Sequence, residues 1–175
     1  FTFSGGSSVM NGDFENPEFD IYFHAGYKRY LGNSVNINLT YHKFNLVYQD
    51  LQYEGHMSFD LNVEINLSPF KKFSPYVFVG GGMHASNYFT ITEPKVQGGA
   101  GFEILISNGL GIKIFGDYNY VFSDEIDGKI YGVSDDVYYR MGLGLNIYFG
   151  KYGSRNRISS KEPTVINSNP IVDDY

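Results

Sequence analysis

The feature that most constrains this chain is a strict two-residue alternation of apolar with polar or small side chains. It is clearest in 137–149, VYYRMGLGLNIYF, where every odd-numbered residue from Val137 to Phe149 is apolar and the residues between are small, polar or amphipathic. Successive side chains of a β-strand point to opposite faces, so this segment predicts a long strand with one wholly apolar face. The same alternation recurs in 57–67 and 110–122, which favours an antiparallel β protein.

Weaker versions of the pattern fill most of the remaining chain up to residue 150. They occupy 1–10, 20–30, 34–42, 76–86 and 96–106. Together the segments predict about eight strands of about ten residues each, the length with which a tilted strand spans a lipid bilayer. The composition agrees, because Tyr and Phe supply all of the 18% aromatic content and there are 21 Gly, which favours strands and turns over helices.

The connections between these segments alternate between short and long. The short ones, at 31–33, 68–75 and 107–109, carry the Gly, Asn or Pro of tight turns, and the longer ones cover 11–19, 48–55, 87–95 and 123–136. Strict alternation predicts that the tight turns gather at one end of the sheet and the loops at the other. This is the layout of an outer-membrane barrel with short periplasmic turns and long external loops.

The last 25 or so residues differ from the rest. Segment 151–175 has no periodicity and is rich in Ser, Asn and Pro, so we expect a flexible tail after a barrel of residues 1–150. With an even number of strands, both termini leave on the turn side, which predicts a periplasmic tail. The chain begins with Phe1 rather than Met, and we expect that it is a processed or excised piece.

Alternation alone leaves open which face points inward. A soluble lipocalin-like barrel or a β-sandwich hides its apolar face, whereas a membrane barrel turns it to lipid and fills a narrow lumen with polar and small residues. Here the polar face combines several Gly with mid-strand charges of both signs, which favours a lumen plugged by paired charges over an ordinary solvated surface. The predicted lumen network is Lys28, Asp60, Glu64, Glu103, Lys113, Asp117 and Arg140.

Aromatic residues on the apolar face gather near the predicted strand ends. Amphipathic rings concentrate at both interfaces of a membrane, so these positions predict two aromatic girdles. Toward the loops we assign Tyr41, Tyr118, Tyr120, Phe122 and Tyr139, and toward the turns Tyr27 and Phe149.

Charge and chemistry exclude several functions. A net charge of −6 argues against nucleic acid as a partner, and the absence of Cys removes thiolate metal sites. Acidic residues dominate the long connections, where we count only Lys95 and Lys129 as cations; such a rim suits lipopolysaccharide bridged by cations or a basic partner, or simply keeps exposed loops soluble.

Catalytic and metal sites are weakly supported. His24, His42 and His84 fall on the predicted lumen face, with the first two near each other across a hairpin, but a metal site needs three or four converging ligands. No G-x-S-x-G motif occurs, and His56, beside Glu54 and Ser58, is the one candidate for an enzymatic rim site. We therefore expect a protein without cofactor, metal or catalytic residues.

The short-turn and long-loop alternation, the GGG of 80–82, the segment 101–128 and the closing GLGLNIYFG of 142–150 resemble small eight-stranded OmpA-like outer-membrane barrels of Bacteroidota type. Gly144, Ile147 and Phe149 are similar to the signal for barrel assembly, although that signal normally ends the chain. More narrowly, the closing half is similar to the C-terminal barrel of curli secretion proteins of the CsgG/HfaB family.

These observations predict an all-β, eight-stranded, antiparallel, up-and-down transmembrane β-barrel in a Gram-negative outer membrane. The resemblance implies a non-enzymatic anchor or accessory subunit of an envelope or secretion complex, in contact with outer-membrane lipid and lipopolysaccharide. Three alternatives remain open at this point: a narrow pore or transporter for small hydrophobic molecules, a soluble lipocalin-like binding barrel, and an enzyme with a site at the rim near His56.

Overall fold

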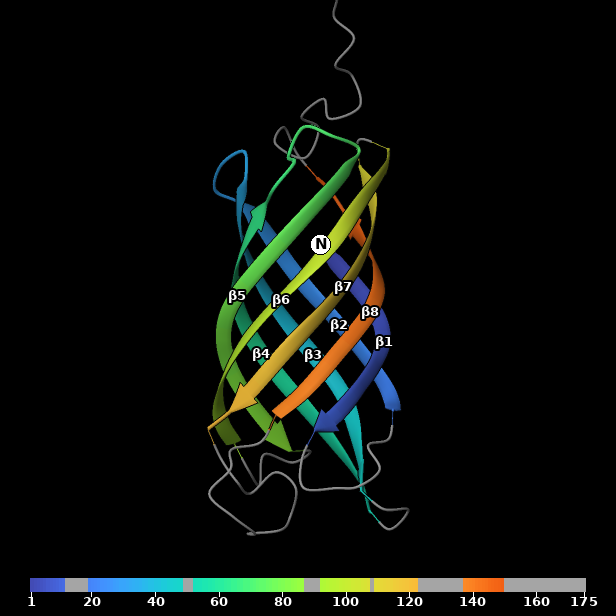
Figure 1. Ribbon diagram of the computed structural model, residues 1–175, viewed down its shortest axis with the longest axis vertical. Coiled ribbons are helices and arrows are strands. Elements are labelled where there is room, and N and C mark those ends of the chain that lie inside the picture. The colour runs from blue at the N-terminus through green and yellow to red at the C-terminus, as the bar shows by residue number, and fades with distance from the viewer. Residues whose placement is uncertain (12–18, 49–51, 87–91, 108, 123–136, 150–175) are drawn as a thin grey trace, which may run out of the picture.

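The computed structural model describes residues 1–11, 19–48, 52–86, 92–107, 109–122 and 137–149, and these form a closed barrel of eight strands (Figure 1). The strands are β1 (Thr2–Asn11), β2 (Phe19–Tyr30), β3 (Val35–Tyr48), β4 (Gln52–Asn66), β5 (Phe73–Ser86), β6 (Thr92–Ser107), β7 (Leu110–Val121) and β8 (Val137–Ile147). No helix in the described part of the chain is long and apolar enough to cross a membrane.

Each strand pairs with its neighbours in sequence, and the sheet closes where β1 pairs with β8. That closing ladder runs antiparallel from Thr2 opposite Asn146 to Asn11 opposite Val137. All eight pairings are antiparallel, so the chain runs up and down around the barrel and each described strand has a partner strand on both sides. The predicted fold is confirmed.

Several strands are longer than the alternation predicted. The pairing of β3 with β4 continues to Tyr48 opposite Gln52, so most of the expected 48–55 loop is strand. Likewise β5 begins at Phe73 and β6 at Thr92, because partner strands supply backbone hydrogen-bonding partners past the point where the side-chain pattern fades. In contrast β8 ends at Ile147, two residues before the predicted Phe149.

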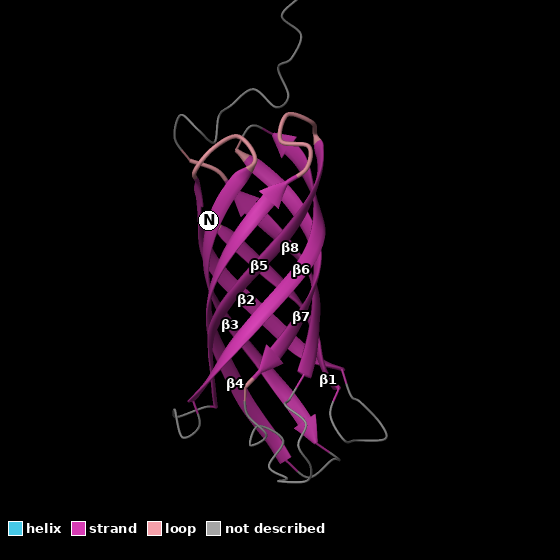
Figure 2. Ribbon diagram, turned by 60° about the vertical axis from the view of Figure 1, so that its left-hand side comes forward, coloured by secondary structure: helices cyan, strands magenta, loops and turns pink. Residues whose placement is uncertain are grey.

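The tight turns lie at one end of the barrel together with the start of β1 and the end of β8 (Figure 2). Leu31 N donates to Val35 O at 3.0 Å in the β2–β3 turn, and Leu67 N donates to Pro75 O at 2.8 Å in the β4–β5 turn. The amino group of Phe1 donates to Ile147 O at 2.7 Å, which joins the two ends of the described chain. The predicted 11–19 loop falls largely, and the 123–136 loop and the 151–175 tail wholly, outside the described residues.

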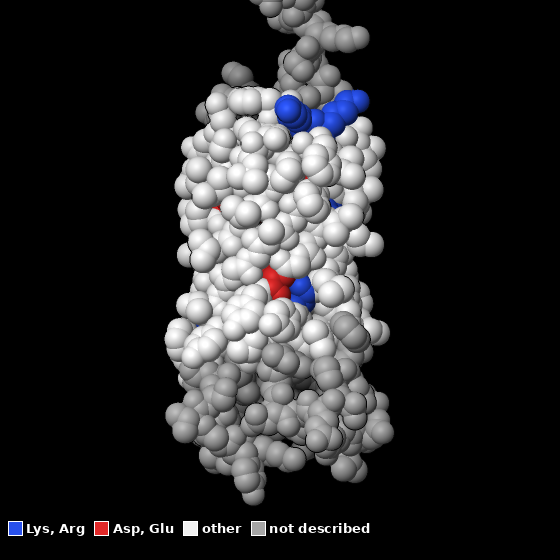
Figure 3. Space-filling view, in the orientation of Figure 1, with Lys and Arg blue, Asp and Glu red and all other residues white. Residues whose placement is uncertain are grey.

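The apolar face of the barrel points outward and the polar face inward. Val79 and Leu143 on the outside are 65% and 60% exposed, whereas Asp60 and Arg140 on the inside are 0% and 1% exposed. The wall seen in Figure 3 is accordingly almost free of charged side chains. This arrangement is the reverse of a lipocalin-like barrel or a β-sandwich, so the structure rules out the soluble alternative.

Glycine on the inner face makes room for the polar side chains of the lumen. A Cβ atom at Gly82 would lie 2.2 Å from Phe59 O and 2.5 Å from Asp60 Oδ1, and one at Gly144 would lie 1.9 Å from Ser4 Oγ. No side chain larger than hydrogen fits at either position without a shift of the backbone. The glycines of the polar face are therefore required by the narrow bore of an eight-stranded barrel.

Candidate functional site

The most distinctive chemical feature of the protein is the polar network that fills the lumen. The structure places all seven residues assigned to this network from the sequence on the inner face, and it adds Lys95. Together they provide four buried cations and four buried carboxylates, so their formal charges cancel. The cations are Lys28, Lys95, Lys113 and Arg140, and the carboxylates are Asp60, Glu64, Glu103 and Asp117.

Arg140 on β8 is the centre of the network. Its Nε and Nη2 atoms donate to Oδ1 and Oδ2 of Asp117 on β7, each at 2.9 Å. Nη2 also donates to Gln97 Oε1 at 2.8 Å and lies 3.4 Å from Oδ2 of Asp60 on β4. Because β4 and β8 lie on opposite sides of the closed sheet, this one side chain bridges the lumen.

Lys95 completes the central cluster from β6. Its Nζ donates to Asp60 Oδ2 at 2.9 Å, Gln97 Oε1 at 2.8 Å and Asn119 Oδ1 at 2.7 Å, which uses all three hydrogens of the ammonium group. The prediction that Lys95 is a loop cation is therefore wrong, because the residue belongs to β6 and is buried. The signal that could have found it is its alternation with Val96, which is outward-facing, and Gln97, which is buried.

A second cluster lies nearer the tight turns. Lys28 Nζ on β2 donates to Glu64 Oε1 on β4 at 2.7 Å, across the intervening β3. Asn36 and Asn38 on β3 donate to the two oxygens of the same carboxylate, each at 2.9 Å. Glu103 lies opposite Lys113 in the register of β6 and β7, so the turn-side half of the lumen holds two cations and two carboxylates.

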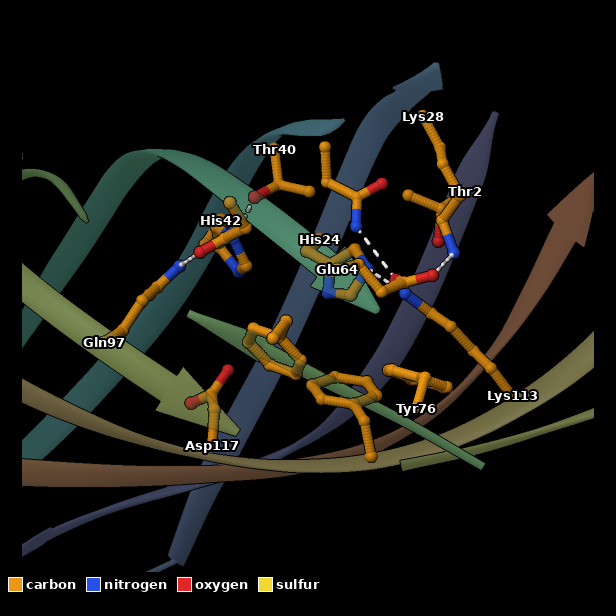
Figure 4. Close-up of a pocket in the computed structure, with 14 residues that line it drawn as sticks. Thr2, His24, Lys28, Thr40, His42, Glu64, Tyr76, Gln97, Lys113 and Asp117 are labelled. Atoms are coloured by element: carbon orange, nitrogen blue, oxygen red, sulfur yellow. Dashed lines mark hydrogen bonds and ion pairs between the residues drawn. The ribbon is translucent and has the colours of Figure 1, made fainter. Parts of the chain in front are cut away.

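Two histidines and a tyrosine connect the clusters. Tyr22 Oη lies 2.5 Å from His24 Nδ1 and 2.7 Å from His42 Nδ1. The far nitrogen of His24 is 2.8 Å from Lys113 Nζ, and the far nitrogen of His42 is 3.0 Å from Asp60 Oδ2. Figure 4 shows both histidines pointing into the lumen between the labelled charges. The two are directly opposite in the β2–β3 register, as their places in the sequence suggested.

The remaining histidines form a separate pair on the loop side. His84 Nε2 lies 3.0 Å from His56 Nδ1, and both rings pack against Phe44. His56 is therefore buried inside the barrel rather than placed at an accessible rim, while Ser58 donates to Asp60 instead of to a histidine. The side chain of Glu54 lies outside what the structure describes. Among the described side chains, His56 and Ser58 therefore do not form the rim site considered from the sequence.

Little free space remains between the two charge clusters of the described lumen. A cavity of about 30 Å³ lies between the two charge clusters, lined by residues that include His24, Lys28, Glu64 and Lys113 (Figure 4). That volume corresponds to about one water molecule. Within the described residues, three or more His, Cys, Asp or Glu side chains do not converge in a way that would hold a metal ion.

The seven residues assigned to the aromatic girdles all belong to the outward-facing set. Tyr118 and Tyr139 pack edge to face with ring centroids 5.3 Å apart, and Tyr120 packs on Phe122 at the same distance. At the turn end Phe1 contacts both Tyr27 and Phe149. Tyr41 packs on Phe59 nearer the middle of its strand. Aromatic rings therefore lie close to both ends of the wall, beside β1, β2 and β8 at the turn end and beside β7 and β8 at the loop end, with Tyr41 set further in.

Comparisons with known proteins point to the fold alone. No model of a known protein family matches the sequence, and neither does any curated protein. Among solved structures, Neisserial surface protein A aligns over 85% of this chain and 95% of its own, with a TM-score of 0.65 and 13% identity.

A second match is Ail, the attachment invasion locus protein of Yersinia pestis. It aligns over 85% of this chain and 95% of its own, with a TM-score of 0.53 and 14% identity. Ail is also described as an outer membrane protein. Sequence identity this low does not indicate a shared substrate or partner. The closed sheet of eight antiparallel strands is shared, so the chain has the fold of the small eight-stranded outer-membrane β-barrels.

Proposed function

We propose that this protein is a non-enzymatic barrel of a Gram-negative outer membrane, acting as a membrane anchor or an accessory subunit of an envelope complex. The observation that carries the proposal is the combination of an outward apolar wall with a lumen filled by cancelling charges. Such a wall is unfavourable in water, and the cavity between the two charge clusters of the described lumen has room for about one water molecule. The surfaces that we expect to act in this function are the outer wall, in contact with lipid, and the two ends of the barrel.

The filled lumen supports an anchor over a pore. The bidentate Arg140–Asp117 pair and the three donors of Lys95 occupy the bore at its middle. Moving an ion through would require breaking hydrogen bonds between buried charges, which costs several kcal/mol for each unpaired group. A narrow pore or a transporter of small hydrophobic molecules is the alternative.

The arrangement in the envelope follows from the same proposal. We place the tight turns and both termini on the periplasmic side and the longer loops outside, in contact with lipopolysaccharide. A narrower version, based on the resemblance to Bacteroidota barrels of the CsgG/HfaB family, makes the chain an accessory barrel of a curli-type secretion complex. Affinity purification from detergent-extracted envelopes, with mass spectrometry of what is retained, tests this version: co-purification of a secretion channel supports it, and purification of the barrel alone counts against it.

The first experiment tests the membrane barrel. The chain is expressed behind a signal peptide, outer membranes are isolated and washed with alkaline carbonate, and gel mobility is compared before and after heating. Retention in the membrane together with heat-modifiable migration is expected. Release into the soluble fraction would contradict the proposal, because the protein would then not be a membrane barrel.

The second experiment tests the filled lumen. The refolded barrel is incorporated into a planar lipid bilayer and the current is recorded under an applied voltage. We expect no steady conductance above that of the bare bilayer. Discrete, reproducible conductance steps would favour the pore alternative.

The non-enzymatic part of the proposal is tested separately. The folded barrel is incubated with ester, amide and phospholipid substrates, and the His56→Ala variant serves as the comparison. No turnover is expected from either protein. Hydrolysis by the wild type that disappears in the variant would make the protein an enzyme.

A further inference from the structure

An apolar groove runs along the outer wall of the barrel over β5, β6 and β7. Its volume is about 420 Å³, and it is bounded by Val77, Phe102, Ile114 and Leu67. Ala100 and Gly116 form its floor, directly opposite each other in the β6–β7 register. The groove exists because two of the smallest residues meet on a wall otherwise built from large apolar side chains.

Space above the floor is open. A Cβ atom at Gly116 would have only Arg140 O within 4 Å, at 3.8 Å, so the missing side chain leaves a depression rather than a tightly packed site. Phe102 and Ile114 beside it are 48% and 47% exposed. A volume of about 420 Å³ falls within the range of roughly 300–1,000 Å³ typical of small-molecule sites. The lining is almost entirely hydrocarbon, which suits an acyl chain.

Two exposed lysines stand at the turn end of this groove. Lys71 and Lys72 belong to the β4–β5 turn, whose flanking residues Leu67 and Pro75 both line the groove and are joined by a hydrogen bond of 2.8 Å. Lys72 O also accepts from Leu105 N at 2.8 Å, which fixes the turn against β6. Neither lysine forms an ion pair with a described residue, and Figure 3 shows basic side chains gathered at this end of the barrel.

We propose that the groove and the two lysines bind one anionic glycerophospholipid. One acyl chain lies over Ala100 and Gly116, and the headgroup phosphate lies between Lys71 and Lys72. The negative phosphate complements the two ammonium groups. The lysines lie where the apolar wall ends, just as the headgroup of a lipid lies where its acyl chains end. The inference rests on the proposed membrane function, since a glycerophospholipid reaches this wall only from a bilayer.

The test uses the absence of tryptophan from this chain. Phe102→Trp introduces a single fluorescent reporter in the groove, and Phe23→Trp introduces a matched reporter on the outer face of β2. Each variant is incorporated into phosphatidylcholine vesicles that contain a brominated lipid, either phosphatidylglycerol or phosphatidylcholine, because bromine quenches tryptophan on contact. At the groove we expect phosphatidylglycerol to be preferred by about five-fold or more, which is the effect of about one lysine near an anionic lipid. At the control reporter we expect equal quenching.

Substitutions separate a site from general attraction of anionic lipid to a cationic protein. Lys71→Gln with Lys72→Gln should abolish the preference at the groove reporter, whereas Arg29→Gln with Lys43→Gln, which removes two outward cations elsewhere, should leave it intact. Gly116→Leu should fill the groove and lower quenching by phosphatidylglycerol, whereas Gly5→Leu on the outer face of β1 should not.

The outcomes distinguish this inference from the function on which it rests. Incorporation into vesicles is scored by heat-modifiable migration of the same samples. A barrel that inserts but shows equal quenching by the two lipids, or a preference that survives loss of both lysines, would overturn the lipid site and leave the membrane function standing. Failure of the wild type to insert would overturn both.

Discussion

Arg140 and Asp117 lie opposite each other in the register of β7 and β8, and the guanidinium donates to both oxygens of the carboxylate at 2.9 Å. Two parallel hydrogen bonds between opposite charges are among the strongest hydrogen-bonded pairings of side chains in proteins. Both groups are withdrawn from water in the middle of the barrel. The integrity of the lumen therefore depends on keeping each charge partnered.

Arg140→Met should lower the free energy of unfolding by about 3–5 kcal/mol, because it leaves a buried carboxylate without its partner. The double variant Arg140→Met with Asp117→Asn should recover part of the loss, since the uncompensated charge is then gone. Urea unfolding of the barrel in lipid vesicles measures both. Wild-type stability in the single variant would contradict the lumen assignment.

Two neighbouring cations on β2 should contribute very differently to the stability of the barrel. Lys28 points inward and donates to Glu64 at 2.7 Å, whereas Arg29 is exposed on the outer face. Lys28→Met is expected to cost about 3 kcal/mol by leaving Glu64 short of a cation, and Arg29→Met about 0.5 kcal/mol or less. The melting temperatures of the two variants, measured side by side, provide the comparison. Equal losses of melting temperature would contradict the assignment of Lys28 to the lumen and Arg29 to the outer face.

Inward and outward glycines should respond differently to a methyl group. Gly82→Ala places a Cβ 2.2 Å from Phe59 O, so it should destabilise the barrel by about 2 kcal/mol or more. At Gly98 the nearest atom is Phe78 O at 3.7 Å, and Gly98→Ala should be neutral or slightly stabilising. The fraction of protein that migrates as the folded form without heating measures the outcome. A fully folded Gly82→Ala variant would show that the lumen has more room than its contacts indicate.

A charge on the outer wall tests directly whether that wall faces lipid. Leu143 lies mid-strand on β8 and Leu31 at the β2–β3 turn, and each is 60% exposed. In a bilayer, Leu143→Lys should cost about 2–4 kcal/mol and Leu31→Lys about 0–1 kcal/mol, because the penalty depends on depth. Urea unfolding in vesicles gives both values. On a protein surrounded by water the two substitutions would be equally harmless.

The amino-acid sequence by itself determined the strands and the sides they present. Alternation in segments such as 137–149 is enough to sort the residues onto two faces, since the side-chain period of a strand is two, and the Gly and charged residues on one face indicated that this face lines the lumen. The same pattern separated the charged residues of the lumen from the aromatic residues of the wall. It also set the mutual placement of His24 and His42, because a short hairpin fixes the register of its two strands.

The assignment of residues near strand ends depended on how far each strand extends. Lys95 immediately precedes the predicted strand 96–106 and was assigned to a loop, although it is buried and its Nζ lies 2.9 Å from Asp60 Oδ2. The reason is that β6 extends along β5 and β7 as far as backbone partners are available, irrespective of whether the side chains there alternate clearly. Side-chain pattern records burial, whereas strand ends are set by hydrogen bonding to neighbours.

Only the tertiary structure decided which polar residues meet. Arg140 and Asp60 are 80 residues apart, and their contact requires the sheet to close through β1 and β8 so that opposite walls face each other across a narrow bore. The outer groove likewise arises because the β6–β7 register sets Ala100 beside Gly116. A sequence records to which face each side chain belongs, but closure and register, which are set by cooperative pairing of all eight strands, determine its partners.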